Sequence, residues 1–457
     1  MKLQKLQRTL FILVIITGAL LLSYFRILDN YELETLDMRF RLRPPLPVDD
    51  KIAIIEIADD TIKKLGQWPI SRKYHALLVY ALTQAGAEAI VFDVFFSDPS
   101  DEDADSRLEK AITHSGRVYL PYVFDQIEPR MVQEDVLPRF KKHVKGTGFI
   151  NIVPDTDGKF RRIPTSIRYE GKLHPHLALR VAGEKVADPF LLVNFPGKWE
   201  ETFRHYSFID VIDSHMSSQF PEALDRKPAL DLRELKGAVC FVGVTATATP
   251  DAHPTPVGAV YPGVGVHASV LNSILTDRSV QRAGRIANMV ILILLCLSVY
   301  FISMRLRKSA GFIAVAILIP VYTLAAMLIF FYSGLWIDII SPITITFVFY
   351  LILTIVRYIG EMNRMELLER ELGIAKKIQE SFLPKKMPKV KGLEIAAKMV
   401  TARQVGGDLY DFVHMGESAF GVMIGDVAGK GIPAALYMAK VVSEFKSCAI
   451  HSADQAI

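Results

Sequence analysis

The sequence predicts a multidomain membrane protein: an α/β domain outside the membrane, four transmembrane helices and a further strand-and-helix segment at the C-terminal end. Three observations lead to this fold class. The 457 residues are enough for about three domains at ~100–200 residues each, 51% of them are hydrophobic, and four long stretches contain no Asp, Glu, Lys or Arg. Because 53 Lys and Arg nearly balance 49 Asp and Glu, nothing indicates a nucleic-acid partner.

The uncharged stretches are the predicted membrane spans. Each reaches at least the lower end of the range of about 17–25 apolar residues with which helices cross a hydrocarbon core of about 30 Å. The segment after the first stretch, Ser23-Tyr-Phe-Arg, has no small-residue cleavage site, so residues 9–28 are predicted to remain as an anchor. The four stretches are Thr9–Phe25, Ile286–Met304, Ser309–Ile337 and Ile339–Val356.

Basic residues beside the spans predict the orientation, because Lys and Arg near a span tend to stay in the cytoplasm. Residues 1–8 and the segments after the second and fourth spans are basic, whereas the loop before the fourth span carries only Asp338. Residues 29–285 are therefore predicted to be extracytoplasmic, residues 286–356 to form three spans, and residues 357–457 to be cytoplasmic. Arg278, Arg282 and Arg285 oppose this topology, but they end a long exported domain, where the rule is weak.

The cysteines are expected to form no disulfide. The predicted topology places Cys240 in the outer domain, Cys296 in a span and Cys448 in the cytoplasm. The outer domain must then be stabilised by its hydrophobic core.

The outer domain is predicted to begin with a strand, a helix and a second strand. Lys51–Ile57 is apolar and β-branched, Ser71 is placed to cap an amphipathic helix, and Glu88–Phe96 is a second apolar run. Such a βαβ unit places its two strands parallel in an α/β domain.

Later strands are predicted to form a hairpin. Gly148–Val153 and Phe160–Tyr169 flank Asp157-Gly158, a typical hairpin turn. The segment from Asp155 to Gly158 lacks the third ligand position and the distal Glu of a calcium loop, so we interpret it as a turn.

A succession of short motifs then resembles the second type of CHASE sensor domain, over nearly all of residues 29–285. Such domains are bacterial extracytoplasmic sensors, typically followed by three membrane helices and a cytoplasmic output domain, and this resemblance implies an outer ligand without naming it. The motifs are Glu34–Arg43, Trp68-Pro69 with Arg72, Ala89–Phe96, Gly148–Asp157, Val242-Gly243 and Pro262–Ala268.

Several residues of this domain are candidates for a ligand pocket, although each also has an ordinary structural interpretation. The candidates are Trp68, Arg72, Asp93 and Asp251. Gly263-x-Gly265-x-x-Ala268 lacks the acidic partner of a dinucleotide fingerprint. His174 and His176 lack further ligands at metal spacing, so we expect them at the surface.

Residues 357–383 are predicted to form a helical signalling linker that ends at Pro384. Apolar residues recur in it at alternating steps of three and four, which indicates either a parallel dimeric coiled coil or a surface helix packed on the following domain. These positions are Met365, Leu368, Leu372, Ala375, Gln379 and Phe382.

The residues with chemical potential lie between Val405 and Met438. Phe420–Ile424 is predicted to be a short buried strand that leads to Asp426, and glycines before Pro433 permit a tight turn into a helix. Asp408 follows two glycines. Two loop carboxylates in this context suit either a turn or a hard divalent cation such as Mg²⁺ or Mn²⁺.

Three segments in this region resemble the SpoIIE/RsbU type of PPM metal-dependent serine phosphatase: Ile378-Gln379 with Phe382–Pro384, Val405–Asp411 and Gly425–Ala435. The resemblance implies that residues 384–457 form the N-terminal half of an α/β sandwich. It further implies that Asp408, Asp426 and the Val427 carbonyl bind two Mn²⁺ or Mg²⁺ ions, with Asp408 and Asp426 as the catalytic residues. Asp411 is assigned no ligand role.

The same resemblance implies a phosphoserine protein as substrate, commonly a phosphorylated anti-sigma-factor antagonist. Because the family carries further acidic ligands on later strands, we expect the sequence to be a fragment that stops at Ile457. Two hypotheses stand: a transmembrane receptor phosphatase, or a non-catalytic sensor with an inactive phosphatase segment. Gly425–Lys430 is not a Walker loop, because its glycines are too close and no Ser or Thr follows Lys430.

Overall fold

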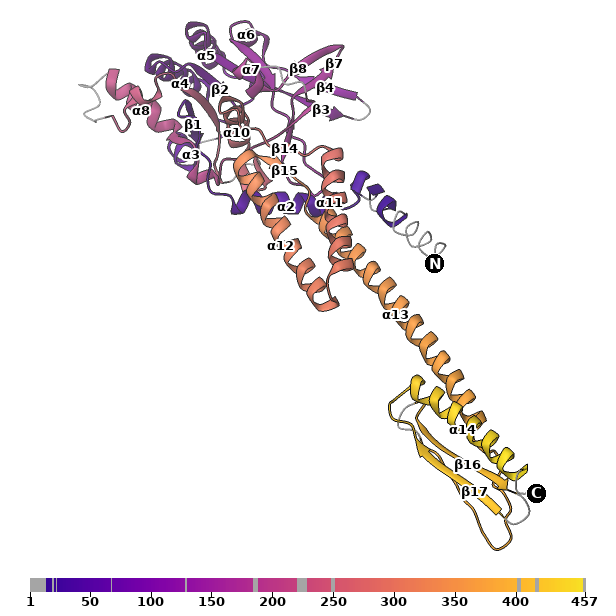
Figure 1. The fold of residues 1–457 in the computed structure, drawn as a ribbon. Coiled ribbons are helices and arrows are strands. Elements are labelled where there is room, and N and C mark those ends of the chain that lie inside the picture. Colours follow the sequence, from indigo (N-terminus) through magenta and orange to yellow (C-terminus); the bar gives the residue numbers. More distant parts are fainter. Residues whose placement is uncertain are drawn as a thin grey trace. The chain divides into compact units, whose positions relative to one another are not determined.

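The computed structural model describes residues 14–454, apart from residues 19, 22, 67, 128–129, 184–187, 220–227, 248–250, 401–403 and 416–418. The chain divides into two compact units, Met1–Phe349 and Tyr350–Ile457. Each unit is described by itself below (Figure 1).

The first unit is built on a central sheet of 7 strands in the order β10-β1-β11-β2-β3-β4, with β5 paired to β3. Every pairing is parallel except that of β3 with β4. The strands are β1 (Ile52–Ile57), β2 (Ala89–Phe92), β3 (Val118–Ile127), β4 (Arg130–Glu134), β5 (Gly146–Phe149), β10 (Arg204–Ser207) and β11 (Val239–Val244).

The predicted strand-helix-strand unit is confirmed, with one addition. The helix α4 (Arg72–Ala85) follows Ser71 and connects β1 to β2, which run parallel. However, β11 lies between them and pairs with both. All six of its residues are buried, as expected of a central parallel strand covered on both faces.

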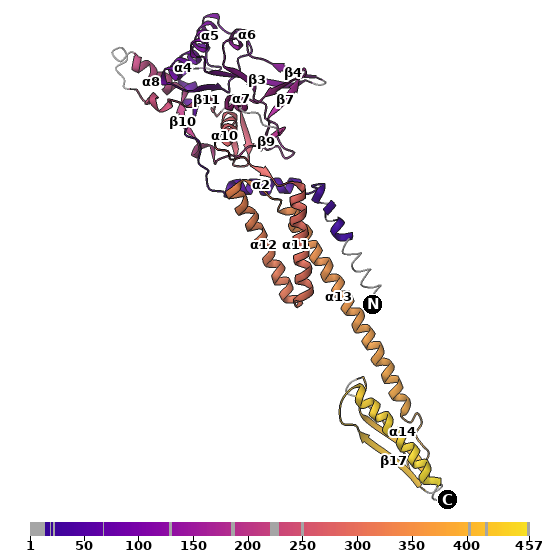
Figure 2. The same ribbon diagram turned by 45° about the horizontal axis from the view of Figure 1, so that its top comes forward.

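Side-chain alternation in the strands divides the core into two layers. In β1, Ile55 and Ile57 belong to one hydrophobic cluster, whereas Ile52 and Ile54 belong to the other. Helices α3 (Asp59–Leu65), α4, α5 (Glu102–Ser115) and α8 (Phe208–Gln219) contribute to the first cluster, and α2 (Asp29–Leu42), α7 (Leu177–Ala182) and α10 (Gly263–Leu275) contribute to the second. Figure 2 shows helices on both sides of the sheet.

The predicted hairpin around Asp157-Gly158 is wrong, although the turn itself forms. Gly158 has φ 81° and donates its N–H to the Asp155 carbonyl at 2.9 Å. The flanking segments pair elsewhere, because β5 joins β3 in the central sheet. The other pairs are antiparallel: β6 (Arg162–Pro164) with β9 (Phe190–Leu192), β7 (Ser166–Tyr169) with β8 (Lys172–Pro175), and β12 (Ala252–Thr255) with β13 (Gly258–Pro262).

Short helical segments complete this unit: α6 (Pro138–Lys141) and the 3₁₀ turns η1 (Trp199–Glu201) and η2 (Leu232–Leu235).

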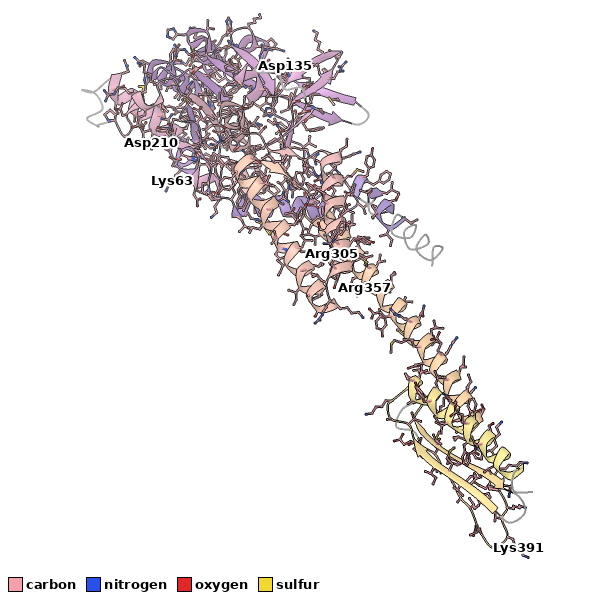
Figure 3. All side chains as sticks on the ribbon, in the orientation of Figure 1. Lys63, Asp135, Asp210, Arg305, Arg357 and Lys391 are labelled. Carbon is pink, nitrogen blue, oxygen red and sulfur yellow. The ribbon has the colours of Figure 1, made fainter. Side chains whose placement is uncertain are left out.

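Three helices in the described part of the chain are long and apolar enough to cross a membrane: α11 (Arg285–Arg305), α12 (Lys308–Ser333) and α13 (Ile340–Phe382). They match the last three predicted spans. Figure 3 labels Arg305 at the end of α11 and Arg357 where the apolar part of α13 gives way to charged residues. The first predicted span, Thr9–Phe25, falls partly on residues outside the described part.

The third predicted span is too long at its C-terminal end. α12 ends at Ser333, because Gly334 adopts the left-handed conformation with φ 71°. Leu335–Trp336 then forms β15, which pairs in parallel with β14 (Gln281–Arg282). The segment that was predicted to continue the span therefore forms a short strand pair within the first unit.

In the second unit, an antiparallel hairpin packs against one helix. The strands are β16 (Asp408–Met415) and β17 (Ala419–Asp426), and the helix is α14 (Ile432–Asp454). A small core forms from Leu383, Leu409, Met438 and Val442. The predicted buried strand is only half-buried, because Val422 and Ile424 are 56% and 84% exposed and alternate with residues on the other face.

The predicted linker helix is confirmed as the C-terminal part of α13, which ends at Phe382 just before Pro384. Met365 and Leu368 are exposed, whereas Gln379 and Leu383 are buried within the second unit. The C-terminal end of the seam thus packs on the following domain, whereas its N-terminal end, at Met365 and Leu368, presents apolar side chains to solvent. The three cysteines are free.

Candidate functional site

The two predicted metal-binding carboxylates lie opposite each other. Asp408 is the first residue of β16 and Asp426 is the last residue of β17, and the two are direct cross-strand partners. Opposite residues in an antiparallel pair have Cβ atoms about 4.5–5.5 Å apart. The hairpin therefore brings both carboxylates to the same end of the sheet.

A carbonyl oxygen joins this group of oxygen atoms. The Val427 N–H donates to the Gly407 carbonyl at 3.1 Å. A Cβ atom built on Gly407 would lie 2.4 Å from the Val427 carbonyl oxygen and 3.1 Å from Asp426 Oδ1. Only glycine allows this close approach, which keeps the carbonyl and the carboxylate together.

The donor set suits a hard cation. Two carboxylates and one carbonyl are the oxygen ligands that Mg²⁺ and Mn²⁺ use, with water filling the other positions. No group of three or more His, Cys, Asp or Glu with metal-binding geometry occurs among the described residues. Among the described residues, the oxygen atoms that could hold a cation here are those of Asp408, Asp426 and the Val427 carbonyl, the ligands that the phosphatase resemblance implies.

Glycines after Asp426 shape the connection to α14. Gly429 and Gly431 have φ 126° and 75°, a region that glycine enters without steric cost. The helix begins at Ile432, so Pro433 is its second residue and not its first. Met438 and Val442 of this helix are buried against Leu409 of β16, which fixes the carboxylate end of the hairpin.

Asp411 has a structural position. Its side chain is 2% exposed and lies 3.0 Å from Lys446 Nζ of α14, and its Oδ1 accepts the Phe412 N–H at 2.9 Å. This ion pair between the buried Asp411 and the half-exposed Lys446 joins β16 to α14, and no metal role needs to be assigned to Asp411.

Gln379 was named in the sequence analysis as part of the helical seam and of the phosphatase-like Ile378-Gln379 segment, but its contact with the segment before Asp408 was not predicted. Its Nε2 donates to the Gly406 carbonyl at 2.7 Å, and its Oε1 accepts the Gly406 N–H at 3.3 Å. The side chain of this α13 residue is buried, and Gly406 precedes Asp408 by two residues. The sequence signal for this contact was the amide side chain of Gln379 at a position of the α13 seam where the neighbouring positions are apolar.

In the first unit, the four candidate pocket residues separate into two groups. Trp68 is 41% exposed and Arg72 is held by Asp105 at 2.7 Å and by the Asp98 carbonyl at 2.5 Å. Both fit structural roles. Asp93 and Asp251, in contrast, lie close enough for their charges to interact, and each faces a histidine: Asp93 faces His267 and Asp251 faces His253.

The expectation that His174 and His176 lie at the surface is wrong for His176. His176 is fully buried because it precedes α7 and its Nδ1 accepts the Ala178 N–H at 3.2 Å, which caps the helix. His174 is half-buried and lies 3.0 Å from the Tyr122 hydroxyl.

The glycines of the Gly263-x-Gly265 motif are explained by packing. A Cβ atom on Gly263 would lie 2.6 Å from Asp251 Oδ1, and one on Gly265 would lie 2.5 Å from the Trp199 ring. These close approaches place the start of α10 against its neighbours and call for no nucleotide.

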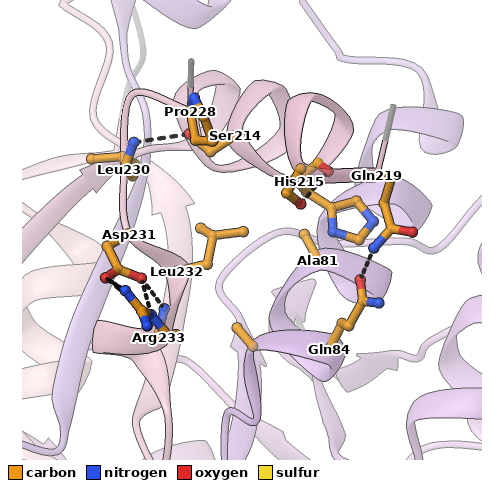
Figure 4. Close-up of a pocket in the computed structure, with 12 residues that line it drawn as sticks. Ala81, Gln84, Ser214, His215, Gln219, Pro228, Leu230, Asp231, Leu232 and Arg233 are labelled. Atoms are coloured by element: carbon orange, nitrogen blue, oxygen red, sulfur yellow. Dashed lines mark hydrogen bonds and ion pairs between the residues drawn. The ribbon is translucent and has the colours of Figure 1, made fainter. Parts of the chain in front are cut away.

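A cavity of about 620 Å³ lies between α4, α8 and η2 (Figure 4). Its polar side chains are mostly engaged with one another: Gln219 Nε2 donates to Gln84 Oε1 at 2.9 Å, and Ser214 Oγ accepts the Leu230 N–H at 3.0 Å. This cavity lies on the face of the sheet that α4 and α8 cover. His267, in contrast, lies on α10, and Asp93 faces it.

Two known proteins share short stretches with this chain. A stretch of 74 residues, 16% of the chain, is 43% identical to Phosphoserine phosphatase RsbU of Bacillus subtilis and covers 22% of that protein. A stretch of 77 residues, 17% of the chain, is 40% identical to Protein IcfG of Synechocystis sp. and covers 11% of it. The chain thus spans only a small part of the length of either relative. No solved structure matches it.

The larger part of the chain matches a family as a whole. The family described as CHASE2 domain covers residues 10–303, more than half of the sequence, and this range includes the central sheet, both helix layers and α11. The chain therefore belongs to the CHASE2 domain family.

Proposed function

We propose that this protein is a membrane receptor in which the CHASE2 domain regulates a cytoplasmic metal-dependent phosphoserine protein phosphatase. The observation that carries the proposal is the cross-strand pairing of Asp408 with Asp426 beside the Val427 carbonyl. The short stretch that is 43% identical to a phosphoserine phosphatase supports the same activity.

Phosphoserine hydrolysis at such a site requires only a few residues of the chain. Bound divalent cations, Mn²⁺ or Mg²⁺, supply an activated water and offset charge on the phosphoryl oxygens in such sites. Asp408 and Asp426 provide the negative charge that holds the cations, and the Val427 carbonyl provides a neutral ligand. Gly407 keeps these oxygens close, and the packing of α14 on β16 keeps the hairpin end in place.

The membrane arrangement is part of the proposal. We infer a fourth span at residues 9–28, an extracytoplasmic domain at residues 29–285 and a cytoplasmic C-terminal part, so that an outer ligand controls the inner site. The exposed apolar residues Met365 and Leu368 of α13 support a parallel homodimer through residues 357–383. The proposed substrate is a phosphorylated anti-sigma-factor antagonist or a similar phosphoserine protein.

The proposal is tested by metal removal. The purified full-length protein is expected to release phosphate from a phosphoserine protein in the presence of Mn²⁺, to lose this activity with EDTA, and to regain it when Mn²⁺ is restored. Phosphate release is followed with a colorimetric assay. Reactions of the Asp408→Asn variant with the same phosphoserine protein serve as the blank. Activity that EDTA leaves unchanged would contradict a metal-dependent phosphatase.

A second prediction concerns Gln379. Replacing it by Leu keeps the side-chain volume but removes both hydrogen bonds to Gly406, so two buried backbone groups lose their partners. We expect the Gly406–Asp408 segment to shift and the turnover number to fall by about 10-fold or more, in line with about 1.4 kcal/mol of lost positioning. The measurement is Mn²⁺-dependent phosphate release.

The control for Gln379 is Glu380→Leu on the neighbouring, exposed position of α13, which should leave turnover within about two-fold. An excess of Mn²⁺ should partly restore the Gln379 variant if the shift weakens metal binding. Equal turnover of the two variants would show that the Gly406 contact does not position the site.

A further inference from the structure

Three buried polar atoms near the end of β2 have no hydrogen-bond partner among the described residues: Asp93 Oδ2, His176 Nε2 and His267 Nδ1. They come from three separate segments, namely the residue after β2, the residue before α7 and the middle of α10. The side chains are close together, since His267 Nε2 lies 3.5 Å from Asp93 Oδ1 and the two imidazole rings are 5.0 Å apart.

These groups are deeply buried. His176 is 0% exposed and His267 is 2% exposed, and the Asp93 side chain is 5% exposed. Because the Nδ1 atom of His176 accepts the Ala178 N–H, the neutral ring carries its proton on Nε2, which is therefore a buried donor without an acceptor. Unpaired buried polar groups are costly, so this cluster calls for a functional explanation.

Burial makes the cluster sensitive to protons. Burial and the nearby charge of Asp251 raise the pKa of Asp93. Burial lowers the pKa of His267 to about 4, although Asp251 raises it in part and His253 lowers it. The pKa of His176 is also lowered by burial and by His267. Because these groups lie this close together, the proton binding of each depends on the others.

The charged groups around the cluster are few. His176 precedes α7, whose charged residue Arg180 is exposed. Asp251 precedes β12 and His253 lies on it, and the two form a pair at 3.2 Å. These two are 38% and 23% exposed, so they link the cluster to solvent.

The strands packed against α10 add no further charge toward the cluster. On β1, Glu56 is engaged by His205 and Thr245. β11 carries no ionisable residue other than Cys240, which belongs to the core layer on the opposite face of the sheet. On β13, the Tyr261 hydroxyl lies 3.4 Å from Ser269 Oγ.

Direct contacts connect the rim of the cluster to α2. The His253 ring lies 4.6 Å from the Phe160 ring, and the Phe160 N–H donates to the Pro254 carbonyl at 2.8 Å. The next residue, Arg161, binds Asp37 of α2 through two hydrogen bonds of 2.7 and 2.8 Å.

α2 in turn holds the start of α13. The Glu32 carboxylate accepts the N–H groups of Ile339 and Ser341 at 2.9 and 2.8 Å. Two of the N–H groups that a helix leaves unpaired at its first turn are thereby satisfied by a fully buried anion. Arg39 donates to the Ile337 carbonyl at 2.7 Å, so α2 contacts the chain on the N-terminal side of α13 twice.

We propose that Asp93, His176 and His267 form a proton-binding site of the CHASE2 domain, and that its protonation state is linked through Arg161 and α2 to the start of α13. Four cavities of the described part, of about 620, 600, 390 and 430 Å³, are lined by other residues. A proton needs no cavity. Only the signalling role of this linkage rests on the proposed receptor function.

The sign of the effect follows from the two kinds of group. Asp93 has a raised pKa in the folded protein, so its contribution to stability is lost as pH rises through that value. Both histidines have lowered pKa values, so their contribution to stability is lost as pH falls below about 6.5, for His267 toward about 4. Asp93→Asn should therefore melt at a higher temperature than wild type at alkaline pH, and His267→Gln should lose less stability on acidification.

The test uses Trp336 of β15, which is 2% exposed, lies 4.2 Å from the Arg282 guanidinium and precedes α13 by a few residues. In a protein of residues 1–457 in detergent, Trp68→Phe and Trp199→Phe leave Trp336 as the one tryptophan of these residues. We expect its emission to change in a transition between pH 8 and pH 4, and expect Asp93→Asn and His267→Gln to shift or remove that transition by at least about one pH unit.

His215→Gln is the matched control, because His215 lies on α8 on the other face of the sheet, and it should leave the transition in place. A flat emission profile in the wild type, or a transition that persists unchanged in both cluster variants, would overturn the proposal. If melting responds to the variants but Trp336 emission does not, the link to α13 is refuted. None of these readouts depends on phosphatase activity, so the two proposals fail independently.

Discussion

Asp426→Asn is expected to abolish Mn²⁺-dependent phosphate release by the full-length protein, with a loss of at least about 100-fold, since even residues that only support metal ligands cost about 10–100-fold. The amide keeps the shape of the carboxylate but removes the negative charge that holds a hard cation. Asp426 ends β17 directly opposite Asp408, so the change reduces the charge of the site by half while the hairpin register is retained. The measurement is initial-rate phosphate release at saturating Mn²⁺.

The matched control for Asp426 is Glu444→Gln, which also converts a carboxylate to an amide. Glu444 lies on α14 and is 65% exposed, 3.6 Å from Lys440, so turnover should stay unchanged. Mn²⁺ binding followed by electron paramagnetic resonance should weaken in the Asp426 variant alone. Unchanged turnover in Asp426→Asn would refute the assignment of this site.

Arg161→Leu is expected to destabilise the CHASE2 domain by about 3–5 kcal/mol, the usual cost of leaving a buried charge without its partner. The guanidinium is 1% exposed and binds Asp37 at 2.7 Å, Asp155 at 3.1 Å and Asp157 at 2.6 Å. Leucine would remove the buried partner of the Asp37 and Asp155 carboxylates, each nearly inaccessible to water. Asp37 would then keep only Lys159 as an ion-pair partner and Asp155 only Arg162, and both of these basic side chains are partly exposed. The measurement is thermal unfolding of the purified protein followed by circular dichroism.

Arg233→Leu provides the comparison for Arg161. Its partner Asp231 is 2.7 Å away, but the Arg233 and Asp231 side chains are 91% and 47% exposed, so the change should leave the unfolding temperature nearly unchanged. A loss in Arg161→Leu no larger than in Arg233→Leu would contradict a stabilising role for the buried cluster.

The Arg161 cluster also predicts a dependence on pH. The hydrogen bond from Arg161 lowers the pKa of Asp157 to about 2. Because the folded value lies below the ordinary value of about 3.9, the stability from this pair is present at neutral pH and is lost as pH falls from about 4 toward about 2. In Arg161→Leu this part of the acid-induced loss should disappear.

Local patterns in the sequence predicted the elements better than their pairing. The apolar runs around Ile52–Ile57 and Ala89–Phe92 are visible in any window, and both are strands. The strand between them, Val239–Val244, arrives more than a hundred residues later, and no local pattern specifies where it inserts. The Asp157-Gly158 turn likewise formed without pairing its flanks, because a turn does not determine which strands lie beside it once β3 offers a longer partner.

The site shows the same division. Asp408 and Asp426 were predicted from glycine context and motif, and the hairpin places them together. The role of Gln379 depends on a contact with Gly406, 27 residues away, which helical spacing cannot show. His176 was placed wrongly because its burial results from capping α7 and packing beside His267, both of which are tertiary facts.

The short strand pair β14–β15 limits how α11 and α12 can move. The Gln281 N–H donates to the Gly334 carbonyl at 3.1 Å, and the Ala283 N–H donates to the Trp336 carbonyl at 2.8 Å. These bonds fasten the beginning of α11 to the end of α12, so neither helix can slide along its axis by itself. A translation of α11 or α12 alone along its axis would have to break these hydrogen bonds. Tilting or rotation of the two helices together leaves the bonds intact.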